Sequence, residues 1–355
     1  MAVRLAIVQV GKGTVGSQLL DQIAAQRGPL RERLGVDLVC AGIAGRSEAA
    51  SDPNGIDLKS WRQALRPGGP DARRLVKELA GALAGPRVLV DATAEEGMAG
   101  LYCEAFEKGF HVVSCNKKPL AGPLAEYRRI KETARRARRA WLYEVSVGAG
   151  LPVIATLRDL LDSGDRITSI EGCFSGTLNF LCASLDRGVR FSEAVSEARD
   201  RGYTEPDPRE DLSGMDVARK ALILAREAGI EIEPRAVALE PFCAVDQGGD
   251  AAAFLAGARA LDEGMARRWS EAERRGGRWR YVAAVGGGCS ARLAEVPADG
   301  ALGRLSGPEN VFSFRTGRYE ASPLVVAGPG AGPAVTAAGA FGDILKLARA
   351  AVLAA

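Results

Sequence analysis

The first 150 residues contain short apolar runs separated by longer segments whose apolar residues recur at helical spacing. Continuous apolar runs of this length are typical of strands buried on both faces of a parallel sheet. The alternation of the two patterns predicts an α/β fold. Five strands are expected, at Arg4–Val10, Asp37–Ile43, Val88–Thr93, His111–Ser114 and Trp141–Val147.

After Pro152 the alternation of strand and helix patterns is lost, which predicts a second domain of the α+β class over residues 152–327. The last helix, Ala334–Ala354, follows a turn rich in glycine and proline. We expect it to return to the first domain, so that residues 1–151 and 328–355 form one unit. Strands of the second domain are expected at Ile167–Phe174, Tyr281–Val285 and Ser290–Val296.

The first strand leads directly into a G-x-G-x-x-G motif, Gly11-Lys12-Gly13-Thr14-Val15-Gly16, and a helical pattern follows it. This order of strand, turn and helix is typical of a Rossmann-type dinucleotide-binding domain. Gly11 would make the tight turn, Gly13 would let the backbone approach a pyrophosphate, and Gly16 would let helix and strand pack closely. The helix N-terminus, with Thr14 and Val15, would supply N–H donors to the phosphates.

The nucleotide preference depends on the end of the second strand, where Arg46 and Ser47 stand. An NAD-specific site usually has an acidic residue there for the ribose 2′-hydroxyl, whereas a basic side chain suits a 2′-phosphate. We therefore expect NADP, with NAD possible; the alternative is an exposed loop arginine. Thr93 and Lys117 also follow strands, at the edge of the sheet where ligands bind in such folds. For Lys117 the alternative is a plain basic turn.

The stretch from Gly202 to Lys220 concentrates acidic residues before a lysine. Pro206 and Pro208 predict a rigid loop, and Ser213 is a good N-cap for a helix that starts beside Asp216. Asp216 and Lys220 would then lie on one face of that helix. One interpretation is a capped helix with a surface ion pair. The other is a site where carboxylates bind an ammonium group and the lysine transfers a proton.

The composition of the chain limits the partners and the acid–base groups that it can use. Hydrophobic residues make up 47% and charged residues 26% of the 355, with a net charge of +3, which favours neither nucleic acid nor a membrane surface as partner. No apolar run approaches the roughly 20 residues of a membrane span. Seven cysteines without a C-x-x-C pair indicate free thiols in a reducing cytoplasm. His111 is the single histidine, so an acid or base is expected among Lys, Asp, Glu, Tyr and Cys.

Several separated motifs together resemble the homoserine dehydrogenase family, and the likeness covers nearly the whole chain, with a looser match over Arg235–Val325. Family members use NAD(P) to interconvert L-aspartate 4-semialdehyde and L-homoserine, in the biosynthesis of threonine, methionine and isoleucine. The resemblance implies a homodimer formed through the second domain. The motifs are GKGTVG, CNKKPLAGP, EVSVGAGLPVI, FSGTLNF, GYTEPDPREDLSGMDVARK and GPGAGPAVTAAGAFGDILK.

The usual bacterial members carry a C-terminal ACT domain, and others are fused to an aspartate kinase. The present sequence ends with the predicted helix at Ala354, so we expect the short form, without ACT-based feedback by threonine. The resemblance implies that Lys220 transfers the proton, and that Glu205 and Asp216 hold homoserine, with Asp211 in the same acidic group.

The resemblance also implies cofactor contacts at Thr93, Gly202 and Gly332. Lys117 matches a family lysine assigned both to the nicotinamide end and to catalysis. A monovalent cation, usually sodium, would bind backbone oxygens at the hinge between the domains. Its ligands would come from Glu144, Val147, Ala149 and Leu151.

Two alternative functions are open at this point. The first is a phosphorylating semialdehyde dehydrogenase in which Cys115, beside lysines, forms a thioester. The second is a module that senses NADP without catalysis. The first alternative has no histidine base nearby in sequence and leaves the stretch from Gly202 to Lys220 unexplained. A lysine-dependent dehydrogenase is preferred to both.

Overall fold

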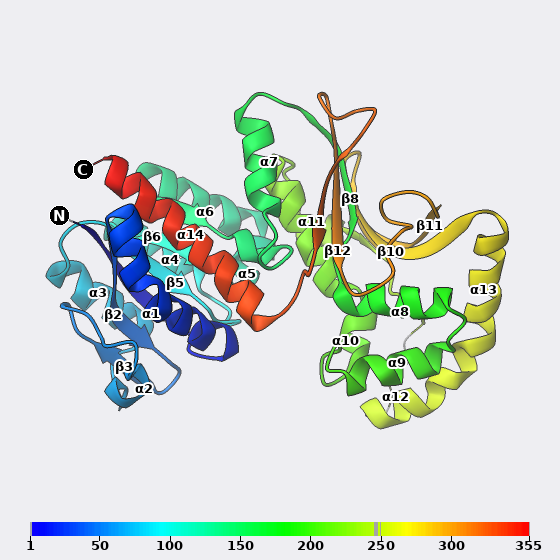
Figure 1. Cartoon of the computed structure of the whole chain (residues 1–355), viewed down its shortest axis with the longest axis horizontal. Coiled ribbons are helices and arrows are strands. Elements are labelled where there is room, and N and C mark those ends of the chain that lie inside the picture. The colour runs from blue at the N-terminus through cyan, green and yellow to red at the C-terminus, as the bar shows by residue number, and fades with distance from the viewer. Residues whose placement is uncertain (1, 245–247, 249, 355) are drawn as a thin grey trace. The chain divides into compact units, whose positions relative to one another are not determined.

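The computed structural model describes residues 2–244, 248 and 250–354. The chain divides into two compact units, coloured by position along the chain in Figure 1. The first comprises Met1–Gly150 and Ala331–Ala355, and the second comprises Leu151–Gly330. Each unit is built around its own sheet.

The first unit contains a seven-stranded sheet with the order β4-β3-β2-β1-β5-β6-β7. The five expected strands lie side by side and parallel, which confirms the α/β class with a Rossmann-type sheet. Two short strands, β3 (Glu48–Ser51) and β4 (Arg66–Pro67), extend one edge antiparallel and were not predicted. The parallel strands are β1 (Val3–Val10), β2 (Val36–Ala44), β5 (Arg87–Asp91), β6 (His111–Ser114) and β7 (Trp141–Leu142).

Two groups of helices contact this sheet (Figure 1). In one group, α1 (Thr14–Leu34) packs along α14 (Pro333–Leu353), and their apolar residues share a core with those of β1 and β2. The C-terminal helix therefore belongs to the first unit. The other group is α3 (Ala72–Ala82), α4 (Ala99–Glu107) and α6 (Leu124–Arg136), with the short helices α2 (Trp61–Ala64) and α5 (Lys118–Ala121) in loops.

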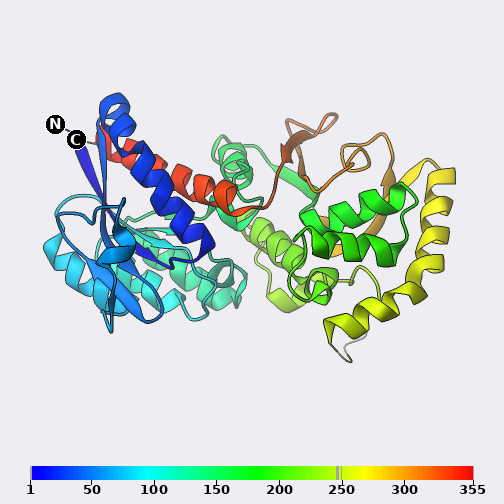
Figure 2. The same cartoon turned by 60° about the horizontal axis from the view of Figure 1, so that its bottom comes forward.

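The second unit contains a six-stranded, mainly antiparallel sheet with the order β13-β12-β8-β10-β11-β9. Helices α8, α11 and α13 contact its central strand β10. Figure 2 shows these helices grouped beside the sheet. The strands are β8 (Ile167–Cys173), β9 (Ala238–Leu239), β10 (Gly277–Val285), β11 (Cys289–Pro297), β12 (Asn310–Thr316) and β13 (Leu324–Gly328). The helices are α7 (Val153–Asp162), α8 (Gly176–Asp186), α9 (Phe191–Asp200), α10 (Pro208–Leu212), α11 (Met215–Glu227), α12 (Ala251–Gly257) and α13 (Asp262–Arg274).

Three local predictions were wrong. The strand expected at Trp141–Val147 ends at Leu142, where a 3-10 turn, Glu144–Ser146, replaces it. The loop expected before Ser213 contains helix α10, because Pro208 occupies the first helical position, where its missing N–H costs nothing, and the Asp207 side chain caps it. Ser213 ends α10, and Gly214, with φ of +72°, precedes α11 in place of the expected N-cap.

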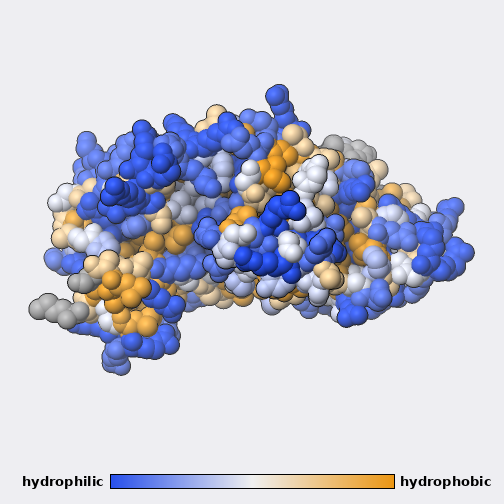
Figure 3. Space-filling model, turned by 90° about the horizontal axis from the view of Figure 1, so that it is seen from above, coloured by the Kyte–Doolittle hydropathy of each residue, from blue (hydrophilic) through white to orange (hydrophobic). Residues whose placement is uncertain are grey.

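Figure 3 shows hydrophilic residues over much of one face of the molecule. Among the described residues, no helix combines the length and the apolar character needed to cross a membrane.

Candidate functional site

The glycine-rich loop of the first unit has a steric reason for two of its glycines. Gly11 has φ of +92°, and a Cβ there would lie 2.6 Å from the carbonyl oxygen of Ala92. A Cβ on Gly16 would lie 2.3 Å from the carbonyl oxygen of Gly11. A Cβ on Gly13, in contrast, would meet no protein atom within 4 Å. Gly11 and Gly16 are therefore required by the loop itself, and Gly13 leaves open space beside it.

The buried side chain of Gln9 holds this loop against the end of β1. Its Nε2 donates to the carbonyl oxygens of Gly11 and Gly16, both at 2.9 Å. Helix α1 begins after Gly13, and no side chain caps its N-terminus. Helix N-termini present N–H donors and a positive dipole end to anions. The loop thus fits the pyrophosphate of a dinucleotide, with Thr14 and Val15 in the first turn.

A network of buried polar groups lies at the carboxyl ends of β5 and β6. The carboxylate of Asp91, fully buried, accepts hydrogen bonds from Thr93 N at 2.8 Å and Thr93 Oγ1 at 2.7 Å, and also from the Tyr102 hydroxyl. Tyr102 Oη lies 2.8 Å from Ser114 Oγ. Burial and the neighbouring carboxylate of Asp91 hold the pKa of Tyr102 well above its usual value, so the hydroxyl keeps its proton. The network fixes Thr93 at the sheet edge.

Asn116 connects this network to the lysine pair. Its Nδ2 donates to Asp91 Oδ2 at 3.2 Å and to the carbonyl oxygen of Glu95 at 2.8 Å, and its Oδ1 accepts from the backbone N–H of Lys118 at 3.0 Å. Lys117, partly buried, stands directly before helix α5. The backbone on both sides of Lys117 is therefore held by buried side-chain contacts.

Arg46 lies in the loop after β2, as expected, with its side chain 89% exposed. Its Nη2 pairs with Glu95 Oε1 at 2.7 Å, and Lys12 pairs with Glu48 at 2.7 Å beside it. The Glu95 carboxylate raises the pKa of Arg46, which stays charged. Arg46 and Lys12 are thus two cations near the end of β2, and each already pairs with a carboxylate. A 2′-phosphate would have to compete with these carboxylates for them.

In the second unit, Lys220 pairs with one member of the predicted acidic group. Its side chain is 10% exposed, and its Nζ pairs with Asp216 Oδ2 at 2.8 Å, four residues back on α11. The same Nζ donates to the carbonyl oxygen of Phe174, at the end of β8, at 2.6 Å. The predicted pairing on one helix face is therefore observed, on a buried amine.

Asp211 holds the loop that carries Glu205. Its Oδ2 accepts from Glu205 N at 2.8 Å, and its Oδ1 lies 3.0 Å from Thr177 Oγ1, which also bonds the carbonyl oxygen of Tyr203. Burial raises the pKa of Asp211, and the negative charges of Glu205 and Asp216 add to the rise. Glu205 is exposed, so the group offers carboxylates to a ligand.

Gly202 and Gly332 have backbone reasons for being glycine. Gly202, with φ of +69°, ends helix α9, where its N–H donates to the carbonyl oxygen of Arg199. Gly332, with φ of +120°, precedes α14 in the first unit. The two glycines lie in different units, and both are exposed.

The residues expected to bind a cation lie at the boundary between the units. Glu144, Val147 and Ala149 are buried in the first unit, and Leu151 opens the second. Gly148 and Ala149 have φ of +81° and +52°, an unusual pair in which a non-glycine residue takes the left-handed conformation. Asp343 of α14 accepts the backbone N–H of Glu144 at 2.9 Å, which explains the turn that replaced the expected strand.

Two functional candidates were not assigned from the sequence. Thr177 contacts Asp211, and Asn310 Nδ2 donates at 3.2 Å to the carbonyl oxygen of Phe174 that Lys220 also uses. Thr177 stands in the FSGTLNF motif, which was a usable signal. Asn310 opens β12, a strand that was not predicted, so its position had no signal in the sequence.

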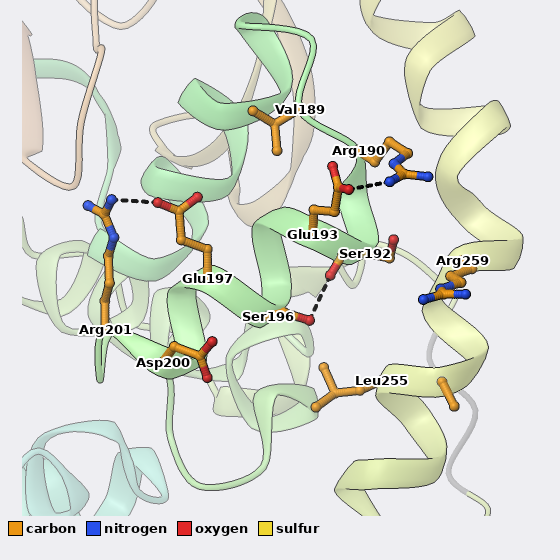
Figure 4. Close-up of a pocket in the computed structure, with 11 residues that line it drawn as sticks. Val189, Arg190, Ser192, Glu193, Ser196, Glu197, Asp200, Arg201, Leu255 and Arg259 are labelled. Carbon is orange, nitrogen blue, oxygen red and sulfur yellow. Dashed lines mark hydrogen bonds and ion pairs between the residues drawn. The ribbon is translucent and has the colours of Figure 1, made fainter.

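A groove of about 1050 Å³ lies between α9 and the segment that includes α12 (Figure 4). Ion pairs between Arg190 and Glu193 and between Arg201 and Glu197 line it. None of the residues predicted for the functional site lines this groove.

Two family models match the chain. The model described as homoserine dehydrogenase matches residues 152–345, more than half of the chain, and the model described as homoserine dehydrogenase, NAD binding domain, matches residues 11–144. The chain belongs to the homoserine dehydrogenase family. The range 152–345 contains the Lys220 group, and the range 11–144 contains the glycine-rich loop.

Sequence relatives and solved structures agree with this family. The chain is 41% identical to bifunctional aspartokinase/homoserine dehydrogenase 2, chloroplastic, from Zea mays over 97% of its own length but only 38% of that protein. A protein of unknown function from Candida auris has a TM-score of 0.86 and 34% identity, with 98% of each chain covered. A hyperthermophilic archaeal homoserine dehydrogenase mutant in complex with NADPH has a TM-score of 0.75 and 25% identity, with 97% of this chain and 98% of that chain covered.

Proposed function

We propose that this homoserine dehydrogenase family member catalyses the NAD(P)-dependent interconversion of L-homoserine and L-aspartate 4-semialdehyde. The observation that carries the proposal is the buried Lys220 amine paired with Asp216, whose charge interacts with that of Asp211, which in turn holds the Glu205 backbone. A cationic amine serves proton transfer to or from an oxygen, and surplus carboxylates serve a substrate that carries an α-ammonium group. An ion pair that served stability alone would not need further carboxylates near Asp216.

Lys220 acts as the acid and base in this proposal. In the direction of reduction its ammonium stabilises the negative charge that develops on the aldehyde oxygen and then donates the proton; in oxidation the neutral amine takes the proton of the alcohol. The bound nicotinamide accepts or supplies the hydride. The carbonyl oxygen of Phe174 and the carboxylate of Asp216 hold the amine from two sides.

Glu205 and Asp216 bind the α-ammonium group of the substrate. Asp211 supports them because it holds the Glu205 backbone and shares Thr177 with the Tyr203 carbonyl. Lys117 assists at the nicotinamide end, from a loop that Asn116 fixes. The second unit is thus the proposed substrate-binding domain. The family resemblance supports the further proposal that this unit also forms a homodimer.

The first unit binds the cofactor. Gly11, Gly13, Gly16 and the start of α1 receive the pyrophosphate, Thr93 contacts the nicotinamide side, and Gly202 and Gly332 complete the contacts. Arg46 binds the 2′-phosphate, so NADP is preferred over NAD. Support comes from the open space beside Gly13 and from the position of Arg46 in the loop after β2.

A monovalent cation, sodium by preference, binds backbone oxygens of Glu144, Val147, Ala149 and Leu151. The left-handed conformation of Ala149 supports this part of the proposal, because such conformations in non-glycine residues cluster at ligand sites. Activity in buffers with sodium, potassium or only a bulky organic cation at equal ionic strength tests it. Equal rates in all three would contradict a cation requirement.

The alternative that uses Cys115 is not favoured. Burial raises the pKa of its thiol, and the nearby carboxylates of Asp91 and Asp343 raise it further, whereas a nucleophilic cysteine needs a lowered pKa. No role for Lys220 would remain in that reaction.

Oxidation of L-homoserine with NAD and with NADP in parallel tests the proposed function. Reduction of the nucleotide that requires L-homoserine is expected, with a higher kcat/KM for NADP. Replacing the substrate by 4-hydroxybutanoate, which lacks the ammonium group, should abolish most of the rate. Absence of turnover with either nucleotide would refute the function, and a preference for NAD would refute the role of Arg46.

A further inference from the structure

The carbonyl oxygen of Phe174 has two buried donors in the second unit. Lys220 Nζ donates to it at 2.6 Å, and Asn310 Nδ2 donates at 3.2 Å. Phe174 directly follows β8 and Asn310 is the first residue of β12, so they meet at the same end of this antiparallel pair. A carbonyl oxygen has two lone pairs, and these two donors occupy both.

Asn310 is fixed in this position by its surroundings. It is fully buried and pairs with Gly328 of β13, and a Cβ on Gly330 would lie 1.9 Å from its Nδ2. Its Oδ1 has no hydrogen-bond partner among the described residues. A buried amide oxygen without a partner costs free energy, so an apolar side chain would suit this place better unless the Nδ2 donor has a purpose.

We propose that Asn310 is a positioning residue for Lys220 and acts through the carbonyl group of Phe174. The amide of Asn310 fixes the direction of that carbonyl and shares its electron density. The carbonyl therefore holds the Lys220 amine in place without favouring the ammonium form as strongly as an unshared acceptor would. Asp216, which pairs with the amine at 2.8 Å and interacts with Asp211, favours the ammonium form, so the shared carbonyl limits a bias that would hinder a base.

The expected effect of Asn310 substitutions on turnover rests on the proposed function. Their expected effect on the protonation of the Lys220 amine does not. In Asn310→Ala, the unshared carbonyl should favour the ammonium form, and in Asn310→Asp an added negative charge should favour it more. The pH at which homoserine oxidation reaches half its maximum is expected to rise by about one pH unit in Asn310→Ala and further in Asn310→Asp. At neutral pH, kcat should fall about tenfold while the KM for NADP stays unchanged.

Asn179 provides a matched control. It is a buried asparagine at the same end of the sheet, and its Nδ2 donates to the carbonyl oxygens of Glu309 at 2.7 Å and Cys173 at 3.3 Å. It therefore ties the same two strands together without contacting the Phe174 oxygen. Asn179→Ala should lower the melting temperature as Asn310→Ala does, and it should leave the pH profile of turnover unchanged.

A titration of the protein labelled with ¹³C at the lysine ε-carbon gives a readout that does not need turnover. The Lys220 signal is assigned by its loss in Lys220→Arg, and its pH midpoint is expected to rise in the order wild type, Asn310→Ala, Asn310→Asp. If Asn310→Ala does not fold, the nearly isosteric Asn310→Asp carries the test. An unchanged midpoint in folded Asn310→Asp, or an equal shift in Asn179→Ala, would overturn the proposal. Absence of homoserine oxidation by the wild type would refute the proposed function only.

Discussion

The glycine-rich loop at Gly11–Gly16 and the group around Lys220 are built in opposite ways. The loop is proposed to bind through backbone N–H groups, and its defining residues lack side chains because Cβ atoms at two of them would meet backbone oxygens. The Lys220 group consists of side chains from α8, α10 and α11 together with the backbone carbonyl of Phe174, directly after β8. A loop of one short segment can be recognised from spacing alone, whereas the side-chain group depends on contacts between distant parts of the chain.

The largest expected effect is on the Lys220 side. Lys220→Met removes the proposed proton-transfer group and should lower kcat for homoserine oxidation by about 10²- to 10⁴-fold, the usual contribution of a general acid or base. The affinity for NADPH, measured by fluorescence, should stay near that of the wild type. Arg219→Met is the control. Arg219 is the residue before Lys220 and its side chain is exposed, so this substitution should leave kcat unchanged. Turnover in Lys220→Met within tenfold of the wild type would contradict the assignment.

Substitutions of Gly16 and Gly13 should separate the role of the loop in folding from its role in cofactor binding. Gly16→Ala places a Cβ 2.3 Å from the Gly11 carbonyl oxygen and should destabilise the first unit by about 1–3 kcal/mol, with loss of NADPH binding. Gly13→Ala has open space and should weaken NADPH binding at an unchanged melting temperature. Thermal unfolding with and without NADPH distinguishes the two variants. Equal melting temperatures for both would contradict the steric argument.

The Asp91 network should show an effect of about 2 kcal/mol. Tyr102→Phe removes a buried donor to the Asp91 carboxylate, and hydrogen bonds to charged groups contribute about 1.5–3 kcal/mol. Urea unfolding measures the loss. Tyr319→Phe, on a partly exposed tyrosine of the second unit, is the control and should change little. A Tyr102→Phe protein as stable as the wild type would show that other donors compensate.

The smallest effect is a change in pH dependence at Asp211. Because its folded pKa is raised, the folded state binds its proton more tightly than the unfolded state, whose pKa is about 3.9. Stability should therefore fall as pH rises through the window between these two pKa values, and Asp211→Asn should lack this fall. Urea unfolding across pH 3–7 measures the slope. If the free energy of unfolding depends on pH equally in the wild type and in Asp211→Asn, Asp211 is not the group that causes the dependence.

The sequence permitted prediction of the parallel sheet, the glycine-rich loop and the pairing of Asp216 with Lys220, because each follows from local spacing. Strand β12 was missed, and with it Asn310, since its pairing with β8 is a contact over more than a hundred residues. Strand β13, which pairs with β12, was missed as well. The 3-10 turn at Glu144–Ser146 was read as a strand because its tie to Asp343 is equally distant. Gly214 displaced the expected cap at Ser213 through its left-handed conformation.

The central claim is that the first unit binds the cofactor and the second unit carries the proton-transfer group. Two assays on two variants test this claim most directly. NADPH affinity and homoserine turnover at saturating NADP are measured for Gly13→Ala and Lys220→Met. The account predicts that Gly13→Ala loses affinity and retains most of the turnover at saturation, whereas Lys220→Met retains affinity and loses turnover. Loss of both properties in both variants, with folding intact, would contradict it.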